Sequence, residues 1–259
     1  MLAQSVREGS LQNELAGRVA LVTGASRNIG RAIALDLADA GAAVIVNAVR
    51  AREEAEEVAR SIGERGGKAM VVLADVTDPT AVRSMVDAAV ERFGRIDILV
   101  NNAAVRGERA LEAMTLQEFR AVVSLILEGA FLCCQAALPY LKQSDGAAIV
   151  NIGGMTGHSG AAERVHVVAG KAGLSGLTKG LALELAPAGI TVNCVVPGLI
   201  DTVRAPAAQV PAMHRQNPPA VGRRGRPDEV AAMVRHLAGP NGRFITGQTI
   251  HVNGGAYLG

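Results

Sequence analysis

Seven short runs of apolar residues recur along the chain, at residues 19–23, 43–47, 69–73, 97–101, 147–152, 190–196 and 249–252. Within each run the apolar residues are nearly continuous rather than alternating with polar ones, which is typical of strands covered on both faces. Segments with helical spacing separate the runs. The pattern predicts repeated strand-helix units and a parallel sheet of about seven strands.

Two of the intervening segments show the helical spacing clearly. Ile29, Ile33 and Leu37 are spaced by four, and Gly41 follows at the position of a helix C-cap. Residues 50–65 place their apolar side chains on one stripe and their charges elsewhere, which indicates a helix with a solvated outer face. Because the 259 residues contain no internal repeat or linker, these elements predict one doubly wound α/β domain of the Rossmann type. We expect it to span residues 17–259, with residues 1–16 as a loosely held N-terminal tail.

Composition narrows the possible partners and the compartment. The 26 Lys and Arg residues against 24 Asp and Glu give a net charge of +2, so no long-range field favours nucleic acid or anionic lipid. The N-terminus lacks an apolar signal region, and no stretch holds about 18 uninterrupted apolar residues, which disfavours secretion and membrane insertion. Cys133, Cys134 and Cys194 form no CxxC pair. We expect reduced packing cysteines, no metal site and a cytoplasmic protein.

The first predicted strand leads directly into the segment TGASRNIG at residues 23–30, where the next helix begins. A pyrophosphate requires unpaired backbone N–H groups, the positive end of a helix dipole, and small residues that permit close approach. Gly24 and Gly30 provide that approach. The segment therefore predicts a dinucleotide site, although an ordinary tight turn has the same composition.

The end of the second strand bears on the choice between NAD and NADP. A carboxylate that binds the ribose 2′-hydroxyl is expected there for NAD, but the chain has Asn47. Arg27 in the turn and Arg50 beyond the strand are suited to neutralising a 2′-phosphate. This favours NADP over NAD, while both arginines could equally be solvated surface residues.

Several motifs, in order along the chain, resemble the short-chain dehydrogenase/reductase family. They are TGASRNIG at 23–30, Asp75 with Val76, NNAA at 101–104, Lys171 within GKAGLSGLTKG, VNCVVPGLIDT at 192–202, GRRGRPDEV at 222–230 and ITGQTIHVNGG at 245–255. The matches run from about residue 18 to the C-terminus and are most similar to members of the 3-oxoacyl-acyl-carrier-protein reductase type. The resemblance implies an NAD(P)-dependent oxidoreductase and, as for most relatives, a homotetramer.

The resemblance also implies roles for individual residues. Around the pyrophosphate and ribose it places Gly24, Ser26, Arg27, Asn28, Ile29 and Gly30. Beside the adenine and adenosine it places Asp75, Val76, Asn102 and Ala103. Along the nicotinamide it places Pro197, Gly198, Ile200 and Thr202, with Lys171 holding the ribose hydroxyls.

Four positions depart from the family pattern. Asn28 stands where the middle glycine of the phosphate turn is expected, and asparagine tolerates the left-handed backbone best among the other residues. Ile126, Gly154 and Val167 stand at the positions of the family's relay asparagine, catalytic serine and catalytic tyrosine. Glycine and valine can neither donate a proton nor stabilise an oxyanion, so the usual mechanism is predicted not to operate.

Two hypotheses follow from the missing hydroxyls. In the first, the protein is an NADP-dependent oxidoreductase in which a substitute supplies the proton. His158 is the preferred substitute because imidazole titrates near neutral pH, and Thr156, a bound water and the less well oriented His166 are the alternatives. In the second, the protein is a catalytically silent relative that binds nucleotide as a sensor or acts as a structural partner. The substrate cannot be inferred from the sequence.

Overall fold

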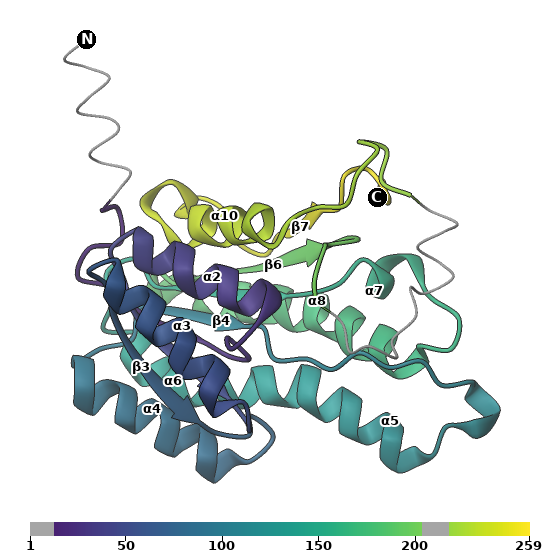
Figure 1. The fold of residues 1–259 in the computed structure, drawn as a ribbon, viewed down its shortest axis with the longest axis horizontal. Helices are drawn as coiled ribbons and strands as arrows, with labels where there is room; N and C mark the ends of the chain where they lie inside the picture. The colour runs from purple at the N-terminus through teal and green to yellow at the C-terminus, as the bar shows by residue number, and fades with distance from the viewer. Residues whose placement is uncertain (1–12, 204–217) are drawn as a thin grey trace.

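The computed structural model describes residues 13–203 and 218–259. Seven parallel strands form one sheet in the order β3-β2-β1-β4-β5-β6-β7 (Figure 1). The strands are β1 Val19–Val22, β2 Ala43–Ala48, β3 Lys68–Leu73, β4 Ile98–Asn101, β5 Ala148–Ile152, β6 Thr191–Pro197 and β7 Thr249–Val252. The predicted doubly wound α/β fold is confirmed.

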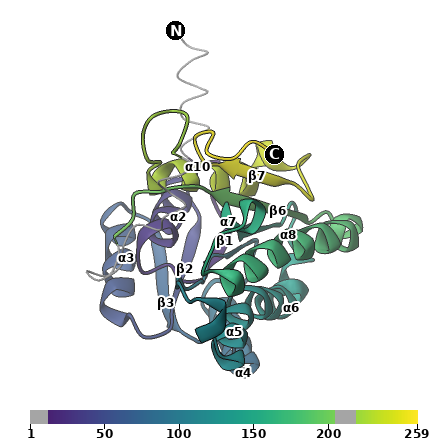
Figure 2. The same ribbon diagram turned by 90° about the vertical axis from the view of Figure 1, so that its right-hand side faces the viewer.

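Helices cover both faces of the sheet (Figure 2). One face carries α2 Asn28–Asp39, α3 Arg52–Glu64 and α10 Pro227–Ala238. The other carries α4 Pro79–Phe93, α5 Leu116–Val123, α6 Gly129–Leu141 and α8 Val165–Leu185. The short elements are η1 Leu111–Ala113, the π-helical turn η2 Ser124–Glu128, α7 Thr156–Ser159, η3 Ala186–Ala188 and η4 Pro240–Gly242.

Local sequence signals explain where these helices begin and which face they bury. Asp78 caps α4 by accepting hydrogen bonds from the N–H groups of Thr80 and Ala81, and Gly94 ends the helix with φ of 78°. In α3 the buried stripe contains Ala55, Val58 and Ile62, as the spacing predicts.

Burial of the strands differs from the expectation at the two edges of the sheet. β1, β4 and β5 are buried throughout, whereas every residue of β7 and all but the exposed first residue of β3 are only half-buried. An edge strand has a neighbour on one side only, so a continuous apolar run there does not guarantee cover on both faces.

Part of the stretch expected to be a tail belongs to the packed domain. Residues 1–12 lie outside the described part of the chain. Leu15 is 1% exposed, and its N–H donates to the carbonyl oxygen of Ala40. Glu14 pairs with Arg235 of α10 at 2.6 Å.

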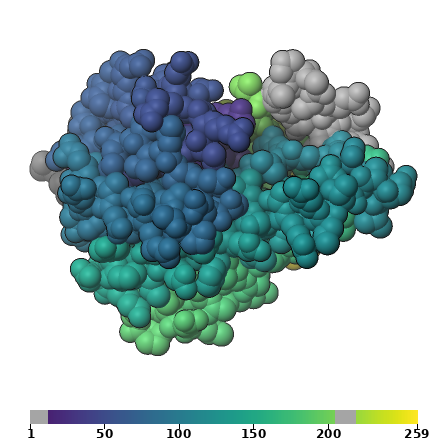
Figure 3. Space-filling model, turned by 90° about the horizontal axis from the view of Figure 1, so that it is seen from below, coloured from purple at the N-terminus to yellow at the C-terminus, as the bar shows by residue number. Residues whose placement is uncertain are grey.

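The helical segment Leu116–Leu141, which joins α5, η2 and α6, is long and apolar enough by length and composition alone to span a membrane. One third of its most apolar stretch is buried within the chain, and it packs beside α4 and α8. Figure 3 shows this helical layer along one face of the molecule, coloured blue to green. Its apolar residues are thus shared between the core and the surface.

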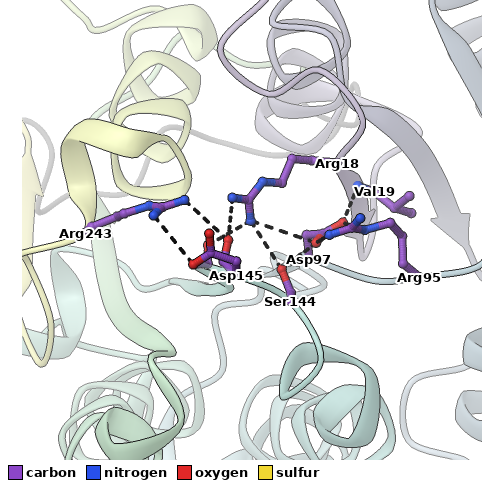
Figure 4. Close-up of polar contacts among 8 residues, drawn as sticks. Arg18, Val19, Arg95, Asp97, Ser144, Asp145 and Arg243 are labelled. Carbon is purple, nitrogen blue, oxygen red and sulfur yellow. Dashed lines mark hydrogen bonds and ion pairs between the residues drawn. The ribbon is translucent and has the colours of Figure 1, made fainter.

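A buried carboxylate joins several segments at the edge of the sheet where the strands begin (Figure 4). Asp97 is 0% exposed and accepts hydrogen bonds from the Val19 N–H at 2.9 Å, from Arg95 Nε at 2.8 Å and from the Ser144 hydroxyl. Burial alone raises the pKa of Asp97, but these hydrogen bonds and the charge of Arg95 outweigh it and hold the pKa below its ordinary value. Asp97 therefore links β1, β4 and the turn before β5.

We expect Asp97→Ala to lower the free energy of unfolding by about 3 kcal/mol, because the Val19 N–H and Ser144 lose their acceptor in a buried site. Urea unfolding at pH 7 measures the change. Asp145→Ala is the matched control, because its side chain is 97% exposed and, among the described residues, forms one ion pair, with Arg243 at 3.7 Å.

The Asp97 contribution should depend on pH in a defined direction. Since the folded pKa is lowered, the stabilisation is present above about pH 4 and is lost as pH falls through the folded value. Equal losses for the two alanine variants, or no pH dependence, would contradict this account.

Candidate functional site

The residues predicted to bind a cofactor lie along the carboxyl edge of the sheet. β1 has β2 on one side and β4 on the other, so the chain leaves β1 at a topological switch point, where a crevice forms in open α/β sheets. Most of the predicted residues lie in the segments that follow β1, β2, β3, β4 and β6, whereas Asn47 lies within β2 and Lys171 on α8. The structure brings them to one edge.

The turn between β1 and α2 has the geometry of a phosphate cradle. Gly24 has φ of 61° and Asn28 has φ of 53°, so asparagine adopts the left-handed conformation expected at this position. A Cβ atom on Gly30 would lie 2.3 Å from the Gly24 carbonyl oxygen, which only glycine avoids. The N–H groups of residues 28–30, in the first turn of α2, have no intrahelical acceptor and lie at the positive end of its dipole.

A threonine that the sequence prediction missed ties this turn to β4. The Thr23 hydroxyl accepts hydrogen bonds from the N–H groups of Asn102 at 2.9 Å and Ala103 at 3.0 Å. The Asn102 amide donates to the carbonyl oxygens of Thr23 and Gly24. Asn102 and Ala103 thus fix the turn. The available signal was a hydroxyl residue at the end of the first apolar run.

Asn47, predicted near the adenosine ribose, is turned into the protein. It is 1% exposed, and its amide nitrogen lies within hydrogen-bond distance of the carbonyl oxygens of Ala48, Val72 and Ala74. Its side-chain oxygen accepts from the Gly24 N–H at 3.2 Å. Asn47 therefore stabilises the phosphate turn through its hydrogen bond with Gly24.

The segments that follow β1 and β2 carry exposed positive charge. Arg27 and Arg50 are exposed, and within residues 13–203 and 218–259 no carboxylate pairs with either. Asp75 accepts two hydrogen bonds from Thr77, and Val76 is 2% exposed against Gly129. The exposed Arg27 and Arg50 and the hydrogen-bonded Asp75 therefore lie in the segments where the adenosine of the cofactor is expected.

The predicted nicotinamide side is built by the segment after β6. A Cβ on Gly198 would lie 2.6 Å from Asn253 Cβ, so glycine lets this segment pass the end of β7. Ile200 pairs with Gly225 through an isolated bridge. The Thr202 hydroxyl accepts from Arg106 Nη1 at 3.1 Å, an arginine that the sequence prediction missed because no motif marks it.

Asn28 links the two sides of the crevice. Its side-chain oxygen accepts from the Val203 N–H at 2.9 Å, and its amide nitrogen donates to the Val203 carbonyl oxygen at 3.2 Å. The residue at the family's middle glycine position therefore joins the phosphate turn to the segment after β6. Residues 204–217 lie outside the described part of the chain.

Lys171, on α8, is the buried cation of the site. It is 8% exposed, and its ammonium donates to the Ile152 carbonyl oxygen at 2.6 Å. Burial lowers the pKa of Lys171 to about 8, with Cys194 raising it slightly and Arg106 lowering it further. The ammonium of Lys171 therefore loses its proton at a lower pH than an ordinary lysine does.

An apolar cluster occupies two of the three positions at which the resemblance predicts catalytic side chains. Ile126 is 2% and Val167 is 4% exposed, and they pack together with Ala130 and Leu174. A Cβ on Gly170 would lie 3.1 Å from Ile126 Cβ, so the absence of a side chain there accommodates the isoleucine. At the third position, Gly154, a Cβ would contact only the Lys171 stem, at 3.6 to 3.9 Å.

The three predicted substitute acids lie in different environments. His158 is half-buried in an aromatic group, with ring centroids 4.8 Å from His251 and 6.1 Å from Tyr257. Burial and Lys179 lower the pKa of His158, and its Nε2 lies 3.4 Å from the Ser175 hydroxyl. Thr156 is 7% exposed.

His166, the third predicted substitute, is 4% exposed. Burial and Arg164 lower its pKa.

Two hollows, of about 180 Å³ and 460 Å³, lie at the other edge of the sheet, where β1, β2, β5 and β6 begin. They are thus remote from the phosphate turn and from Lys171.

Comparison with known proteins identifies this arrangement. The family model described as Enoyl-(Acyl carrier protein) reductase matches residues 24–257. The 3-oxoacyl-[acyl-carrier-protein] reductase FabG of Staphylococcus aureus is 42% identical over 241 residues, covering 92% of this chain and 98% of that protein. The chain belongs to the short-chain dehydrogenase/reductase family. It is accordingly an NAD(P)-dependent oxidoreductase by family, similar to FabG.

Solved structures of family members agree with the fold. A dehydrogenase/reductase from Sinorhizobium meliloti superimposes with a TM-score of 0.91 at 39% identity and covers 97% of this chain and 100% of that one. A short-chain dehydrogenase from Burkholderia cenocepacia in complex with NADP gives 0.88 at 40% identity, with 94% and 99% coverage.

Two adjacent glycines make a direct test of the site geometry. A Cβ on Gly153 would lie 2.8 Å from Cys194 Sγ and 2.9 Å from Val196 Cγ2, whereas Gly154 has room. We expect Gly153→Ser to lose about 1–3 kcal/mol of unfolding free energy through overpacking. Gly154→Ser should stay within about 0.5 kcal/mol of the parent. Urea unfolding of both variants measures this, and equal losses would contradict the geometry.

Proposed function

We propose that the protein is an NADP(H)-dependent carbonyl reductase that works without the family's serine and tyrosine hydroxyls. The observation that carries the cofactor assignment is the phosphate turn. The N–H groups of residues 28–30 lie in the first turn of α2, and Arg27 is the N-cap residue of that helix. Arg50 adds a second charge where a 2′-phosphate would lie. The known complex of a relative with NADP supports this preference.

The cofactor, when bound, would supply a hydride to a carbonyl carbon. The chain's own residues would bind and orient it: Gly24 and Gly30 admit the pyrophosphate, and the segment from Pro197 to Thr202 borders the nicotinamide. Lys171 would hold the ribose hydroxyls. The apolar group of Ile126 and Val167 would keep water away from this side of the crevice.

A second candidate function is favoured by that same apolar group. A nucleotide-binding protein without turnover needs the cradle but no proton donor, and Ile126, Gly154 and Val167 offer none. Such a protein would act as a sensor or as a structural partner. Measurements of binding and turnover on the same preparation separate the two functions.

Calorimetric titration with NADPH and NADH tests the cofactor. We expect NADPH to bind more tightly, and Arg50→Ala and Arg27→Ala each to weaken NADPH about 10- to 100-fold with little effect on NADH, because each removes a charge-assisted contact to phosphate. Arg60→Ala, an exposed arginine on α3, is the matched control. Equal affinities for the two cofactors in the parent protein would contradict the NADP assignment.

A turnover panel tests the reductase itself. NADPH oxidation is followed by absorbance with ketones and aldehydes, including 3-oxoacyl thioesters, because FabG is a 3-oxoacyl-[acyl-carrier-protein] reductase. Turnover with any of these supports the reductase. Tight NADPH binding without turnover across the whole panel supports the silent nucleotide-binding function instead. A variant His158→Ala examines the substitute acid favoured by sequence.

We further propose that the protein assembles as a homotetramer through the helical layer of α5, α6 and α8. Leu183 on α8 is 82% exposed and Phe131 on α6 is 45% exposed, on a layer that includes the long apolar segment Leu116–Leu141. Exposed apolar groups of this kind are typical of protein interfaces. A second copy of the same chain is the partner that this face fits.

Light scattering after size-exclusion chromatography tests the assembly. We expect a mass of four chains for the parent and a smaller species for Leu183→Arg, because a charge would be desolvated at the interface. Glu57→Arg on α3, across the sheet, should leave the mass unchanged. A monomeric parent would contradict the proposal.

A further inference from the structure

We propose that Lys171 is the proton donor of this site, its ammonium acting directly on the substrate oxygen rather than through a hydroxyl residue. This rests on the proposed carbonyl reductase function. The juxtaposition that carries it is a buried ammonium beside Gly154, on the same helix as Val167 and facing no carboxylate within the described residues.

The position of the lysine stem is the first observation. A Cβ on Gly154 would lie 3.6 Å from Lys171 Cγ, 3.7 Å from Cδ and 3.9 Å from Cε. The stem therefore runs past the place where the family's serine side chain is expected. Its ammonium ends at the carboxyl end of β5, on the carbonyl oxygen of Ile152.

The donor capacity of the ammonium is the second observation. An ammonium carries three N–H donors, and the described residues provide Lys171 with one acceptor, the Ile152 carbonyl oxygen at 2.6 Å. Lys171 is thus able to bind a ribose hydroxyl and still present an N–H to a substrate oxygen. A lysine beside the usual tyrosine would not need that capacity.

The surroundings of the lysine are the third observation. Val167 lies one helical turn before Lys171, and it packs on Ile126 in a group without polar side chains. Burial disfavours the charged form of the amine and lowers the pKa of Lys171 to about 8. An ammonium with a lowered pKa is a stronger general acid than one with the ordinary pKa of lysine.

The proton balance is simple. When hydride reaches the carbonyl carbon, the electron pair of the C=O π bond moves to oxygen. That oxygen takes a proton from Lys171 Nζ, so an O–H bond forms and an N–H bond breaks. The neutral amine then regains a proton from solvent water. No further oxidant or reductant is needed.

The pH dependence has a definite sign. Reduction needs the ammonium form, so its rate should be high below the Lys171 pKa and fall as pH rises through about 8. Alcohol oxidation needs the neutral amine and should rise over the same range. Among the described residues, the other ionisable groups that influence the Lys171 amine are Cys194, whose pKa burial raises, and Arg106.

Lys171→Arg is the decisive variant. Arginine keeps the charge and the hydrogen bonds to ribose but does not release its proton near neutral pH. We expect NADPH affinity by calorimetry to stay within about 5-fold, and turnover to fall roughly 100- to 10,000-fold. Lys179→Arg, an exposed lysine two turns further along α8, is the matched control and should leave both unchanged.

A direct titration gives a readout that is independent of turnover. The chain has four lysines, Lys68, Lys142, Lys171 and Lys179. With lysine labelled at Cε, NMR titration should show one signal changing near pH 8 that is missing in Lys171→Arg. If no lysine signal changes near pH 8, or if that signal remains in Lys171→Arg, the proposal is overturned.

The outcomes separate the two proposals. Turnover that survives in Lys171→Arg with an unchanged pH profile overturns the lysine proposal alone and leaves the reductase. Loss of turnover in His158→Ala, with Lys171→Arg active, assigns the proton to the histidine instead. A parent protein that binds NADPH but reduces nothing in the panel overturns the reductase, and the lysine proposal with it.

Discussion

The site that contains the buried ammonium of Lys171 has two differently built parts. On one side, glycine, threonine and asparagine residues hold a turn whose N–H groups are ready for a diphosphate. On the other side, Ile126 and Val167 form an apolar wall. Burying a cation costs free energy unless it is compensated, and here one carbonyl oxygen, that of Ile152, provides the compensation that the described residues show. In the proposed mechanism, cofactor binding and proton supply therefore both depend on this one side chain.

The two halves are held by interactions of different kinds, which explains how one can change without the other. The phosphate turn depends on backbone geometry and on hydrogen bonds that join it to the two neighbouring strands. Asn47 of β2 accepts from the Gly24 N–H, and Asn102, which follows β4, bonds to Thr23. The apolar wall depends on side-chain volume, since Ile126 fills the space that Gly170 leaves open. A substitution in the wall is therefore expected to leave the cradle intact. The frame of the sheet is fastened separately, at its other edge, through Asp97.

Much of this arrangement was predictable from the sequence because it follows from local rules. Continuous apolar runs located all seven strands to within a residue or two, and the TGASRNIG segment located the turn that β1 feeds. The left-handed backbone of Asn28 followed from the chemistry of asparagine. The structure added long-range pairings that no spacing encodes. Asn47 points inward to Gly24, Asn28 pairs with Val203, and Arg106 meets Thr202 across the crevice. His158 packs on His251 for the same reason, since β7 follows it in sequence by about ninety residues but lies beside it in space.

A crystal structure of the protein grown with NADP⁺ and a ketone analogue is the sharpest test of proton donation by Lys171, because it places every hydroxyl and ammonium group against the nicotinamide ring. We expect Lys171 Nζ to be the only protein group of the nicotinamide pocket able to donate a proton within about 3.5 Å of the analogue's oxygen, with Ile126 and Val167 beside it. A tyrosine or serine hydroxyl in that position, for example that of Tyr257 from the same or a neighbouring subunit, would contradict it.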